Sequence, residues 1–390
     1  MRDVVVVSAC RTPIGDFGGS LKSLKPFDLI VPVIEDSLKR AGIEKSQVDQ
    51  VIVGNCFAPL EQNIGRITPL LAGFPYETPG FTINCACASA SMAVIQGVNA
   101  IAMGQVDVVL AGGVESMSNA PYVMDTARWG QRLKHANAYD LVWKSMQEYP
   151  VGGGMGIAAE RLADKYGLSR QEQDELAVTS HKRAVKAIME GRFKREIVPL
   201  NVPAGRGKSI RVDTDEHPRN DTSLESLSKL QPAFKEGGTV TAGNASGIND
   251  GAVAVLLMAG ERASRLGVKT MAGISAFNVA AVDPHLVGIA PVPAIKKVLQ
   301  QRELSLADIQ LFEINEAFAS YYLATEKELG LNREITNVNG SGISLGHPVG
   351  CTGGRILVSL IYEMERQDLH RGISALCAGG GVGTAILVER

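Results

Sequence analysis

The sequence predicts an α/β fold in which one unit of alternating helices and strands occurs twice, around an inserted segment. Residues 26–58 and 291–319 each begin with apolar residues at helical spacing, continue with a Ser-x-x-Asp turn and end in a short apolar strand. Residues 84–113 and 339–383 each run from a loop containing a cysteine through a helix to an apolar strand that ends in glycines. Because alternating helices and strands favour a mainly parallel sheet between helical layers, these segments indicate a duplicated α/β domain.

The first pair of segments can be justified element by element. The first helix is indicated by five apolar residues that share one helical face: Phe27, Ile30, Val31, Ile34 and Leu38. Ser46 and Asp49 then have the spacing of a capping box, ahead of the apolar strand 51–53. Ser305 and Asp308 occupy the same place in the second copy. An accidental match between two common βα units is the alternative explanation of this repeat.

The segment between the two copies has a different character. It contains both tryptophans, a long helix that Ser169 and Glu172 are expected to cap, and a polar stretch over residues 205–228. Insertions of this length in compact proteins usually have a function. We therefore expect a first half made of residues 1–117 and 247–268, an inserted loop domain over 118–246 for ligand binding and subunit contacts, and a second half over 269–390.

Composition and charge exclude several classes of protein. The net charge of 390 residues is only −2, so no overall field attracts nucleic acid or an anionic membrane. The longest apolar run, residues 252–259, is much shorter than a membrane span. The opening MRDVVVVSACRTPIG fits a first buried strand better than a secretion signal. We expect a cytoplasmic protein whose six cysteines are buried or catalytic rather than paired.

The stretch TINCACASASM raises the question of what Cys85 and Cys87 do. A structural zinc site would require a second pair of ligands, and none lies near these cysteines in the sequence. A disulfide between them would close a strained ring. The remaining structural interpretation is that both are small buried residues without a chemical role. Cys87 directly precedes a predicted helix of small residues, and a helix N-terminus lowers a thiol pKa and offers free N–H groups. This position favours Cys87 as a nucleophile.

A nucleophilic cysteine needs a base, and His347 is the best candidate. It is embedded in the glycine-rich loop NVNGSGISLGHPVGCTGGR, whereas the other five histidines stand singly in polar or helical surroundings. Cys377 ends the last predicted helix–strand unit in CAGGGVG, where a thiol and bare amides could meet a ligand. A structural histidine and a core cysteine are the alternative interpretations of these two residues.

Taken together, the motifs of this chain resemble the successive signatures of the thiolase family of acyl-CoA acyltransferases. The resemblance covers essentially the whole chain and rests on the segments INCACASASMAV, GGVESMS, MGIAAE, EHPR, GTVTAGNASGINDGA, INEAF, NVNGSGISLGHPVGCTGGR and CAGGGVGTA. It implies a thiolase-like duplicated five-layered α/β/α/β/α core with an inserted loop domain, and a homodimer or homotetramer. It also implies coenzyme A and acyl-CoA as substrates, with no permanently bound cofactor and no metal.

The resemblance assigns a role to each catalytic candidate. Cys87 would be the acylated nucleophile, His347 would activate its thiol, and Cys377 would act as general acid and base. Asn315 would hold a water molecule that joins His347 in one oxyanion hole. The backbone N–H groups of Cys87 and Gly379 would form a second oxyanion hole. Without the family, Asn315 would be interpreted only as a helix cap.

The resemblance also implies where the coenzyme A ester binds. Arg219, Ser226 and Ser246 match positions that contact the nucleotide and the pantetheine arm. The sequence itself also indicates a binding site here, because a basic stretch can bind the phosphates of coenzyme A. This stretch contains Arg206, Lys208, Arg211 and Arg219. A solvated charged surface is the alternative interpretation of that stretch.

Three further residues are expected to bind the coenzyme A ester, namely Met155, Val287 and Phe318. The short-chain biosynthetic members usually carry His where this chain has Gly154, and Met where it has Val287. Because Val is shorter than Met, we expect an acyl pocket roomier than one built for acetyl groups alone. One or two methylenes change discrimination by only about 1–3 kcal/mol, so chain length stays open. The replacement of NGGAIALGHP by NGSGISLGHP has no chemical explanation.

The expected function is therefore acyl transfer through a cysteine acyl-enzyme. The reaction is either condensation of two acetyl-CoA to acetoacetyl-CoA and CoA, or cleavage of a 3-ketoacyl-CoA by CoA. A longer-chain degradative thiolase and a non-catalytic CoA-binding subunit of a complex are the alternatives. NEAF and the terminal CAGGG disfavour a decarboxylating ketoacyl synthase. Because two thiols would converge on one carbon, Cys87 and Cys377 are also expected to form a reversible disulfide under oxidation.

Overall fold

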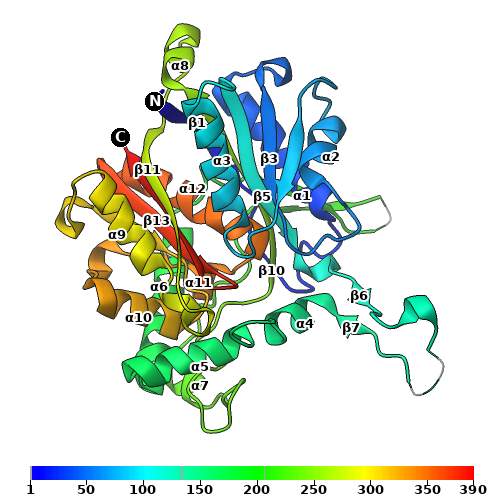
Figure 1. Ribbon diagram of the computed structural model, residues 1–390, viewed down its shortest axis with the longest axis vertical. Coiled ribbons are helices and arrows are strands. Elements are labelled where there is room, and N and C mark those ends of the chain that lie inside the picture. The colour runs from blue at the N-terminus through cyan, green and yellow to red at the C-terminus, as the bar shows by residue number, and fades with distance from the viewer. Residues whose placement is uncertain (1, 132, 134, 206) are drawn as a thin grey trace.

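A ten-stranded sheet runs through the whole protein in this computed structural model, which describes residues 2–131, 133, 135–205 and 207–390 (Figure 1). Its first half contains β1 (Val4–Arg11), β2 (Gly15–Asp16), β3 (Gln50–Gly54), β4 (Gly80–Ile83), β5 (Val108–Ser116) and β10 (Asn249–Ala259). Its second half contains β11 (Ala272–Ala281), β12 (Leu311–Ile314), β13 (Arg371–Ala378) and β14 (Val382–Glu389). The valine run at the start of the chain forms β1, as predicted.

The order of the strands shows that one pattern is used twice. The first half runs β4-β3-β5-β10-β1, with β2 on β10, and the second half runs β12-β13-β14-β11. In each half the pairs around β3 or β12 are parallel and the following pairs are antiparallel. A parallel bridge from Phe312 to Thr336 takes the place of the β3–β4 pairing in the second copy. The two halves are joined where β1 pairs with β11.

Helices form the remaining layers of the fold. The helices of the repeats are α1 (Pro26–Ala41), α2 (Ile64–Leu71), α3 (Ser89–Ala102), α8 (Gly260–Leu266), α9 (Pro291–Gln301), α10 (Ala319–Leu329), α11 (Gly342–Leu345) and α12 (Val349–Gln367). Apolar residues of α3 and α12 form one core with strands from both halves of the sheet. α1 covers the outer face of the first half, and α9 and α10 cover that of the second (Figure 1). The five-layered α/β fold is therefore confirmed.

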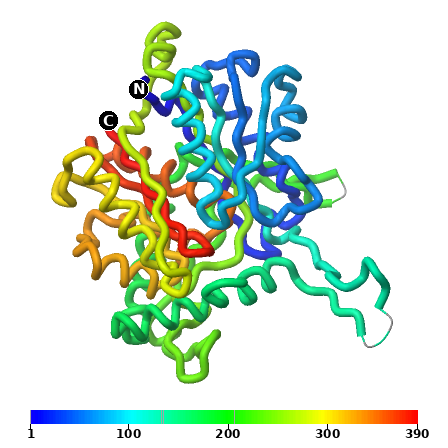
Figure 2. Tube along the Cα trace, viewed as in Figure 1, coloured from blue at the N-terminus to red at the C-terminus, as the bar shows by residue number. Residues whose placement is uncertain are grey.

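The inserted segment passes along one edge of both halves (Figure 2). It contains β6 (Tyr122–Val123), β7 (Tyr139–Asp140), α4 (Leu141–Gln147), α5 (Met155–Tyr166), α6 (Arg170–Met189), β8 (Leu200–Pro203), β9 (Ser209–Val212) and α7 (Leu224–Ser228). β6 and β7 begin an arm that projects from the body of the molecule, and α4 leads back towards the centre (Figure 1). Arg206, part of the predicted basic stretch, lies outside the described residues. Among the described residues, no helix has both the length and the apolar character that crossing a membrane requires.

Two of the three predicted capping boxes are confirmed. Ser169 begins α6, where its hydroxyl accepts the backbone N–H of Glu172 at 3.1 Å. Ser305 caps a short 3₁₀ helix, Leu306–Asp308, in the same reciprocal way. In the second copy, the predicted turn at Ser305 is therefore a capping box.

The capping box predicted at Ser46 and Asp49 is wrong. In the first copy the box is shifted by two residues and formed by Glu44 and Gln47, around the 3₁₀ helix Lys45–Gln47. The carboxylate of Asp49 instead accepts the backbone N–H groups of Asp107 and Val108, both at 2.8 Å. Asp49 therefore fixes the start of β5 rather than a helix, because tertiary partners offer it two donors at once.

Candidate active site

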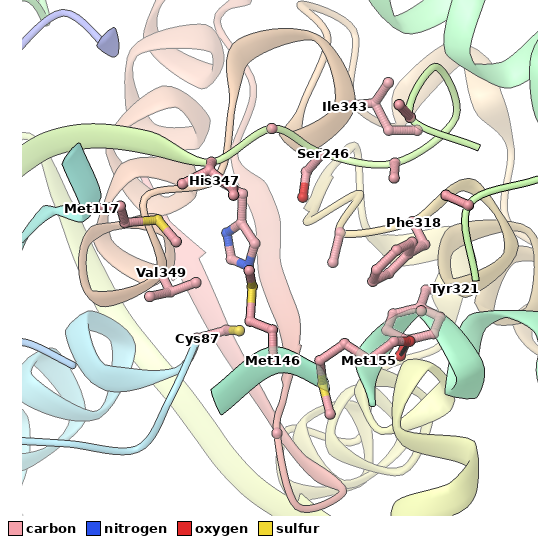
Figure 3. A pocket seen from close by; sticks show the side chains of 18 of the residues that line it. Cys87, Met117, Met146, Met155, Ser246, Phe318, Tyr321, Ile343, His347 and Val349 are labelled. Carbon is pink, nitrogen blue, oxygen red and sulfur yellow. Dashed lines mark hydrogen bonds between the residues drawn. The ribbon is translucent and has the colours of Figure 1, made fainter. Parts of the chain in front are cut away.

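A cavity of about 1040 Å³ lies where the two halves of the sheet meet the inserted segment (Figure 3). It brings together ten of the eleven residues that the sequence predicted for the site: Cys87, Met155, Arg219, Ser226, Ser246, Val287, Phe318, His347, Cys377 and Gly379. The eleventh, Asn315, does not line the cavity but contacts His347 from behind. Residues separated by up to 292 positions in the chain thus share one wall, as the motif pattern predicted.

Cys87 occupies a tight loop between β4 and α3. Ala86 adopts a positive φ of 47°, and the hydroxyl of Ser89 accepts the N–H of Cys85 at 2.9 Å while donating to the carbonyl of Ala86. These contacts fix the thiol two residues before the helix begins. The strained backbone at Ala86 is the kind of outlier that gathers at functional sites.

The expectation that the helix terminus lowers the pKa of the Cys87 thiol is wrong for the free protein. Burial raises the pKa of Cys87 to about 11, although the backbone N–H groups of Gly379 and of Cys87 itself favour the thiolate. Desolvation outweighs these donors because the sulfur is enclosed and the helix starts only at Ser89. The thiol is therefore protonated at neutral pH and depends on a base.

His347 is arranged to be that base. Its Nδ1 lies 2.7 Å from Oγ1 of Thr352, whose hydroxyl already donates to the carbonyl of Pro348 at 2.9 Å. Thr352 can therefore only accept, so Nδ1 carries the hydrogen and Nε2 has a free lone pair. Among the described residues Nε2 has no hydrogen-bond partner. Burial and the nearby guanidinium of Arg355 lower the pKa of His347 to about 3, so the ring is neutral.

Asn315 follows β12 and lies directly behind this histidine. Its Nδ2 is 3.5 Å from Nδ1 of His347, and its buried Oδ1 has no partner in the described part of the chain. The backbone around it is fixed by Asn337, whose amide bonds both the N–H and the carbonyl of Ile314 at 2.8 Å. The free Oδ1 is an acceptor suited to a water molecule, in keeping with the role that the family resemblance implies.

Cys377 and Gly379 come from the end of β13 and the turn that follows it. Cys377 is 3% exposed, and burial together with the neighbouring Cys87 raises its pKa above the usual thiol range. The turn needs glycine at Gly380 and Gly381, whose φ angles are 87° and 84°. Gly379 lies close to the ring of Tyr149, since a Cβ there would be 3.0 Å from a ring carbon.

The predicted ligand residues lie towards the mouth of the cavity. Arg219 and Ser226 are exposed on its wall, and the N–H of Arg219 donates to Nδ1 of His181 at 3.1 Å. Ser246 is fixed by its N–H bond to the carbonyl of Ala317 at 2.9 Å. Lys208 and Arg211, in contrast, do not line the cavity, so the structure separates them from Arg219. The predicted basic stretch is therefore not one continuous surface on the cavity wall.

The acyl end of the cavity is apolar. Val287 is 1% exposed and packs in one cluster with Tyr321 and Cys377, while Phe318 and Met155 border that cluster. Figure 3 shows Phe318, Tyr321 and Met155 grouped on one side of the site, opposite His347 and Cys87.

Gly154 has no room for a side chain. A Cβ at this position would lie 2.8 Å from the carbonyl oxygen of Gln147, where the end of α4 meets the start of α5. The glycine thus permits a close backbone approach rather than opening space in the cavity. The roomier pocket inferred from sequence therefore depends on Val287 alone.

Comparison with known proteins decides the family. The model of the thiolase N-terminal domain matches residues 4–261, and that of the thiolase C-terminal domain matches residues 268–390. The chain belongs to the thiolase family. An acetyl-CoA acetyltransferase of Syntrophomonas wolfei is 45% identical, with 100% of this chain and 99% of that protein aligned.

Solved thiolase structures agree with this assignment. The crystal structure of Bacillus anthracis acetyl-CoA acetyltransferase matches this thiolase with a TM-score of 0.98 at 48% identity, covering 100% of this chain and 99% of the other. Human mitochondrial 3-ketoacyl-CoA thiolase in complex with CoA matches with a TM-score of 0.94 at 39% identity, covering 100% and 98%. With relatives named for acyl transfer along its full length, this thiolase is an acyltransferase.

Sequence reasoning missed several residues of the site in this thiolase. Thr352 orients His347, Tyr149 covers Gly379, and Met146 and Tyr321 line the cavity. Thr352 could have been noticed, because it lies five residues after the histidine in the same motif. Tyr149 and Met146 belong to the inserted segment, whose course over the site no local pattern predicts. In the described ranges, no group of three or more His, Cys, Asp or Glu side chains could hold a metal ion.

Proposed function

We propose that this thiolase transfers acyl groups between coenzyme A thioesters through an acyl-enzyme on Cys87. It either condenses two acetyl-CoA to acetoacetyl-CoA and CoA, or cleaves a 3-ketoacyl-CoA with CoA. One observation carries the proposal: a neutral, buried histidine, whose Nε2 has no partner among the described residues, lies on the wall of the cavity that Cys87 and Cys377 also line. This is the arrangement of a general base beside a nucleophile.

In the acylation step, Nε2 of His347 takes the proton of the Cys87 thiol as the sulfur attacks the thioester carbonyl. The N–H groups of Cys87 and Gly379, which already favour negative charge at the Cys87 sulfur, donate to the oxyanion of the tetrahedral intermediate. The bond from the carbonyl carbon to the CoA sulfur then breaks, and the imidazolium returns the proton to the departing CoA thiolate. The products are acyl-Cys87 and CoA.

In the condensation step, the thiol of Cys377 passes its proton to Nε2 of His347, and the resulting thiolate removes an α-proton from acetyl-CoA. The enolate is stabilised by Nε2–H of the His347 imidazolium and by a water molecule on Oδ1 of Asn315. Its carbon attacks the acyl group on Cys87, so a carbon–carbon bond forms while the carbon–sulfur bond breaks, and the imidazolium returns its proton to the Cys87 thiolate. In the thiolytic direction Cys377 protonates the departing enolate, and its raised pKa suits a group that must hold a proton until then.

Coenzyme A would enter through the mouth of the cavity, against Arg219, Ser226 and Ser246. The position of these residues on the cavity wall supports this proposal, as does the structural relative in complex with CoA. We propose no permanently bound cofactor. The division into a loop domain over 118–246 and two halves belongs to the same proposal, as do a homodimer or homotetramer and a cytoplasmic location.

The preferred chain length is the finer part of the proposal. The short Val287 at the acyl end favours a site that also accepts chains longer than acetyl, which keeps a longer-chain degradative thiolase as the second candidate. Steady-state kinetics across C4 to C16 3-ketoacyl-CoAs separate the two candidates. A maximum at C4 supports the short-chain enzyme, and a maximum at longer chains supports the degradative one.

Purified protein tests the activity itself. We expect CoA-dependent cleavage of acetoacetyl-CoA, and an acyl group on the Cys87 peptide when acetyl-CoA is added without a second substrate. A Cys87→Ala variant is the control for both signals. If the unaltered protein neither cleaves acetoacetyl-CoA nor becomes acylated but still binds CoA, it is the non-catalytic CoA-binding subunit instead.

A further inference from the structure

A chain of hydrogen bonds connects the wall of the cavity to the backbone of the catalytic histidine. His217 lines the cavity, and its Nδ1 bonds the carboxylate of Asp16. Oδ1 of Asp16 also accepts a bond from Nδ2 of Asn249 at 3.3 Å. Oδ1 of the same asparagine accepts the backbone N–H of His347 at 2.9 Å. Only two side chains, those of Asp16 and Asn249, therefore separate His217 from His347.

The inner end of this chain is held rigidly. Asn249 is fully buried, pairs with Asp16 across β10 and β2, and donates to the carbonyl of Gly15 at 3.1 Å. The loop that contains His347 packs closely against Asn249. Gly346 has a φ of 93°, and a Cβ there would lie 2.6 Å from the Asn249 amide carbon. Any shift of the Asn249 side chain therefore moves the backbone of the catalytic histidine.

The outer end is held by the residues that precede His217. Asp215 accepts two bonds from the guanidinium of Arg11, at 2.6 and 2.9 Å, and Glu216 accepts the N–H of Asp16 at 2.9 Å. The ring of His217 packs on Gly247, where a Cβ would be 2.5 Å from a ring carbon. Gly247 follows the predicted ligand residue Ser246. His217 thus stands beside the expected path of the pantetheine arm.

The polarity of the chain follows from its acceptor. An ionised carboxylate can only accept, so Nδ1 of His217 carries a hydrogen and the ring orientation is defined. The hydrogen bond from His217 makes the largest contribution to the lowered pKa of Asp16, so the carboxylate is ionised at neutral pH. Asp16 is the ionised member of the chain, and its carboxylate accepts from both His217 and Asn249.

We propose that Asp16 is a positioning residue that couples occupation of the coenzyme A cleft, sensed at His217, to the placement of His347. The inference rests on the proposed function, because it assigns the cleft to coenzyme A and the histidine to catalysis. Without the carboxylate, the ring of His217 loses its anchor and Asn249 loses one of its two acceptors. Both substrate affinity and the reactivity of Cys87 then fall together.

Steady-state thiolysis and single-turnover acylation of Asp16→Ala and Asp16→Asn test the coupling. We expect Asp16→Ala to raise KM for CoA and to lower the acylation rate, each by about tenfold. Asp16→Asn keeps an acceptor for both partners, so we expect it to recover most of both losses. Asp36→Ala is the matched control, because Asp36 is similarly exposed (30% against 35%) but pairs with Arg40 on the outer helix α1.

A double-mutant cycle tests the connection itself. His217→Ala and Asn249→Ala are expected to depart from multiplicative effects on the acylation rate by about fivefold when Asp16 is present, and to multiply independently in the Asp16→Ala background. Independent multiplication in the presence of Asp16 overturns the coupling. A wild-type rate and KM in Asp16→Ala overturn it as well.

Alkylation of Cys87 by iodoacetamide, followed by peptide mapping, gives a readout that needs neither turnover nor the multiply substituted variants. In the unaltered protein, CoA is expected to change the alkylation rate of Cys87, and Asp16→Ala is expected to lose most of that response while still binding CoA. An equal response in the two proteins overturns the coupling. An unaltered protein that shows the response without any thiolysis contradicts the proposed function and leaves the coupling supported.

Discussion

The Nδ1 atom of His347 lies 2.7 Å from the hydroxyl oxygen of Thr352, inside the first turn and a half of α12. This contact decides which nitrogen of the ring is free, because the threonine hydroxyl already donates to Pro348. The proton acceptor of the site therefore depends on a residue that does not itself line the cavity. Its replacement provides a first prediction.

Thr352→Val removes the acceptor while keeping the shape of the side chain, so the imidazole loses its preference for the hydrogen on Nδ1. We expect the acylation rate to fall about tenfold, the effect of one buried hydrogen bond of roughly 1.4 kcal/mol. Single-turnover acylation by acetyl-CoA measures it. Thr352→Ser keeps the hydroxyl and should stay within about threefold of the unaltered protein. Equal rates in the valine and serine variants contradict the role of this contact.

His347→Ala is expected to uncover the intrinsic acidity of Cys87. A thiol whose pKa is about 11 is ionised in roughly one molecule in ten thousand at pH 7, and this fraction grows about tenfold per pH unit until the pKa is reached. The alkylation rate of Cys87 in the variant should therefore climb steadily from pH 7 to about 11. In the unaltered protein the base assists, so the rate at pH 7 should be higher. Identical rates at pH 7 argue against His347 as the base.

Glu115 should make stability depend on pH. Its buried carboxylate accepts the N–H groups of Cys56 and Phe57, and that of Gly350 at the start of α12, yet burial raises its pKa from 4.5 to about 7. Between pH 4.5 and 7 the folded protein holds a proton that the unfolded chain has released, so this contribution to stability falls as pH rises through that range. Glu115→Gln cannot titrate.

Thermal unfolding checks this sign. We expect the melting temperature of the unaltered protein, relative to Glu115→Gln, to decrease from pH 5 to pH 8. A difference between the two proteins that stays constant over this range contradicts the raised pKa.

Val287→Met is expected to shorten the acyl end of the cavity. The longer side chain would project into the cluster of Tyr321 and Cys377, where the valine is almost fully buried. The ratio of kcat/KM for longer 3-ketoacyl-CoAs to that for acetoacetyl-CoA should fall by about 10- to 200-fold. Val279→Met, at a 40% exposed position of β11, is the control and should leave the ratio unchanged. An unchanged ratio in Val287→Met removes this residue from the determinants of chain length.

Oxidation is expected to join Cys87 and Cys377. Both are free and line the same cavity, and Cys87 helps to raise the pKa of Cys377. Hydrogen peroxide can therefore oxidise the two thiols to a disulfide while it is reduced to two waters. Burial disfavours both thiolates, so the reaction should be slow at neutral pH and faster at high pH. Peptide mapping of peroxide-treated protein checks this, with Cys377→Ser as control. Both thiols found free in inactivated protein contradict it.

The motifs predicted which candidate side chains would line one cavity, because each candidate stands in a short contiguous stretch of unusual composition. The cysteine before a small-residue helix, the histidine in a glycine loop and the thiol before three glycines all meet in one cavity. The direction of the pKa shift at Cys87 could not be predicted, because desolvation depends on everything that encloses the sulfur. The connection through Asp16, Asn249 and His217 was equally hidden, because its members come from three distant segments.

The duplicated architecture was predictable from periodicity, since the helices and strands recur in the same order. The exact position of each turn was not predictable, as the shift of the capping box from Ser46 to Glu44 shows. A spacing of three is common among polar residues, and the choice between candidates depended on the donors that β5 offers to Asp49. Local patterns therefore predict elements better than they predict the partners of single side chains.

The pairing of β1 with β11 means that catalytic turnover could report whether the two halves of the chain have assembled. Cys87 lies in the first half of the fold, whereas His347 and Cys377 lie in the second. In the part of the chain that the structure describes, the strands of the two halves pair only where Val5 meets Gly273 and Val6 meets Ala272. A chain severed between residues 261 and 268 would yield two fragments, each with an incomplete set of reacting groups. Product formation from the mixed fragments would then be a direct assay of their reassembly.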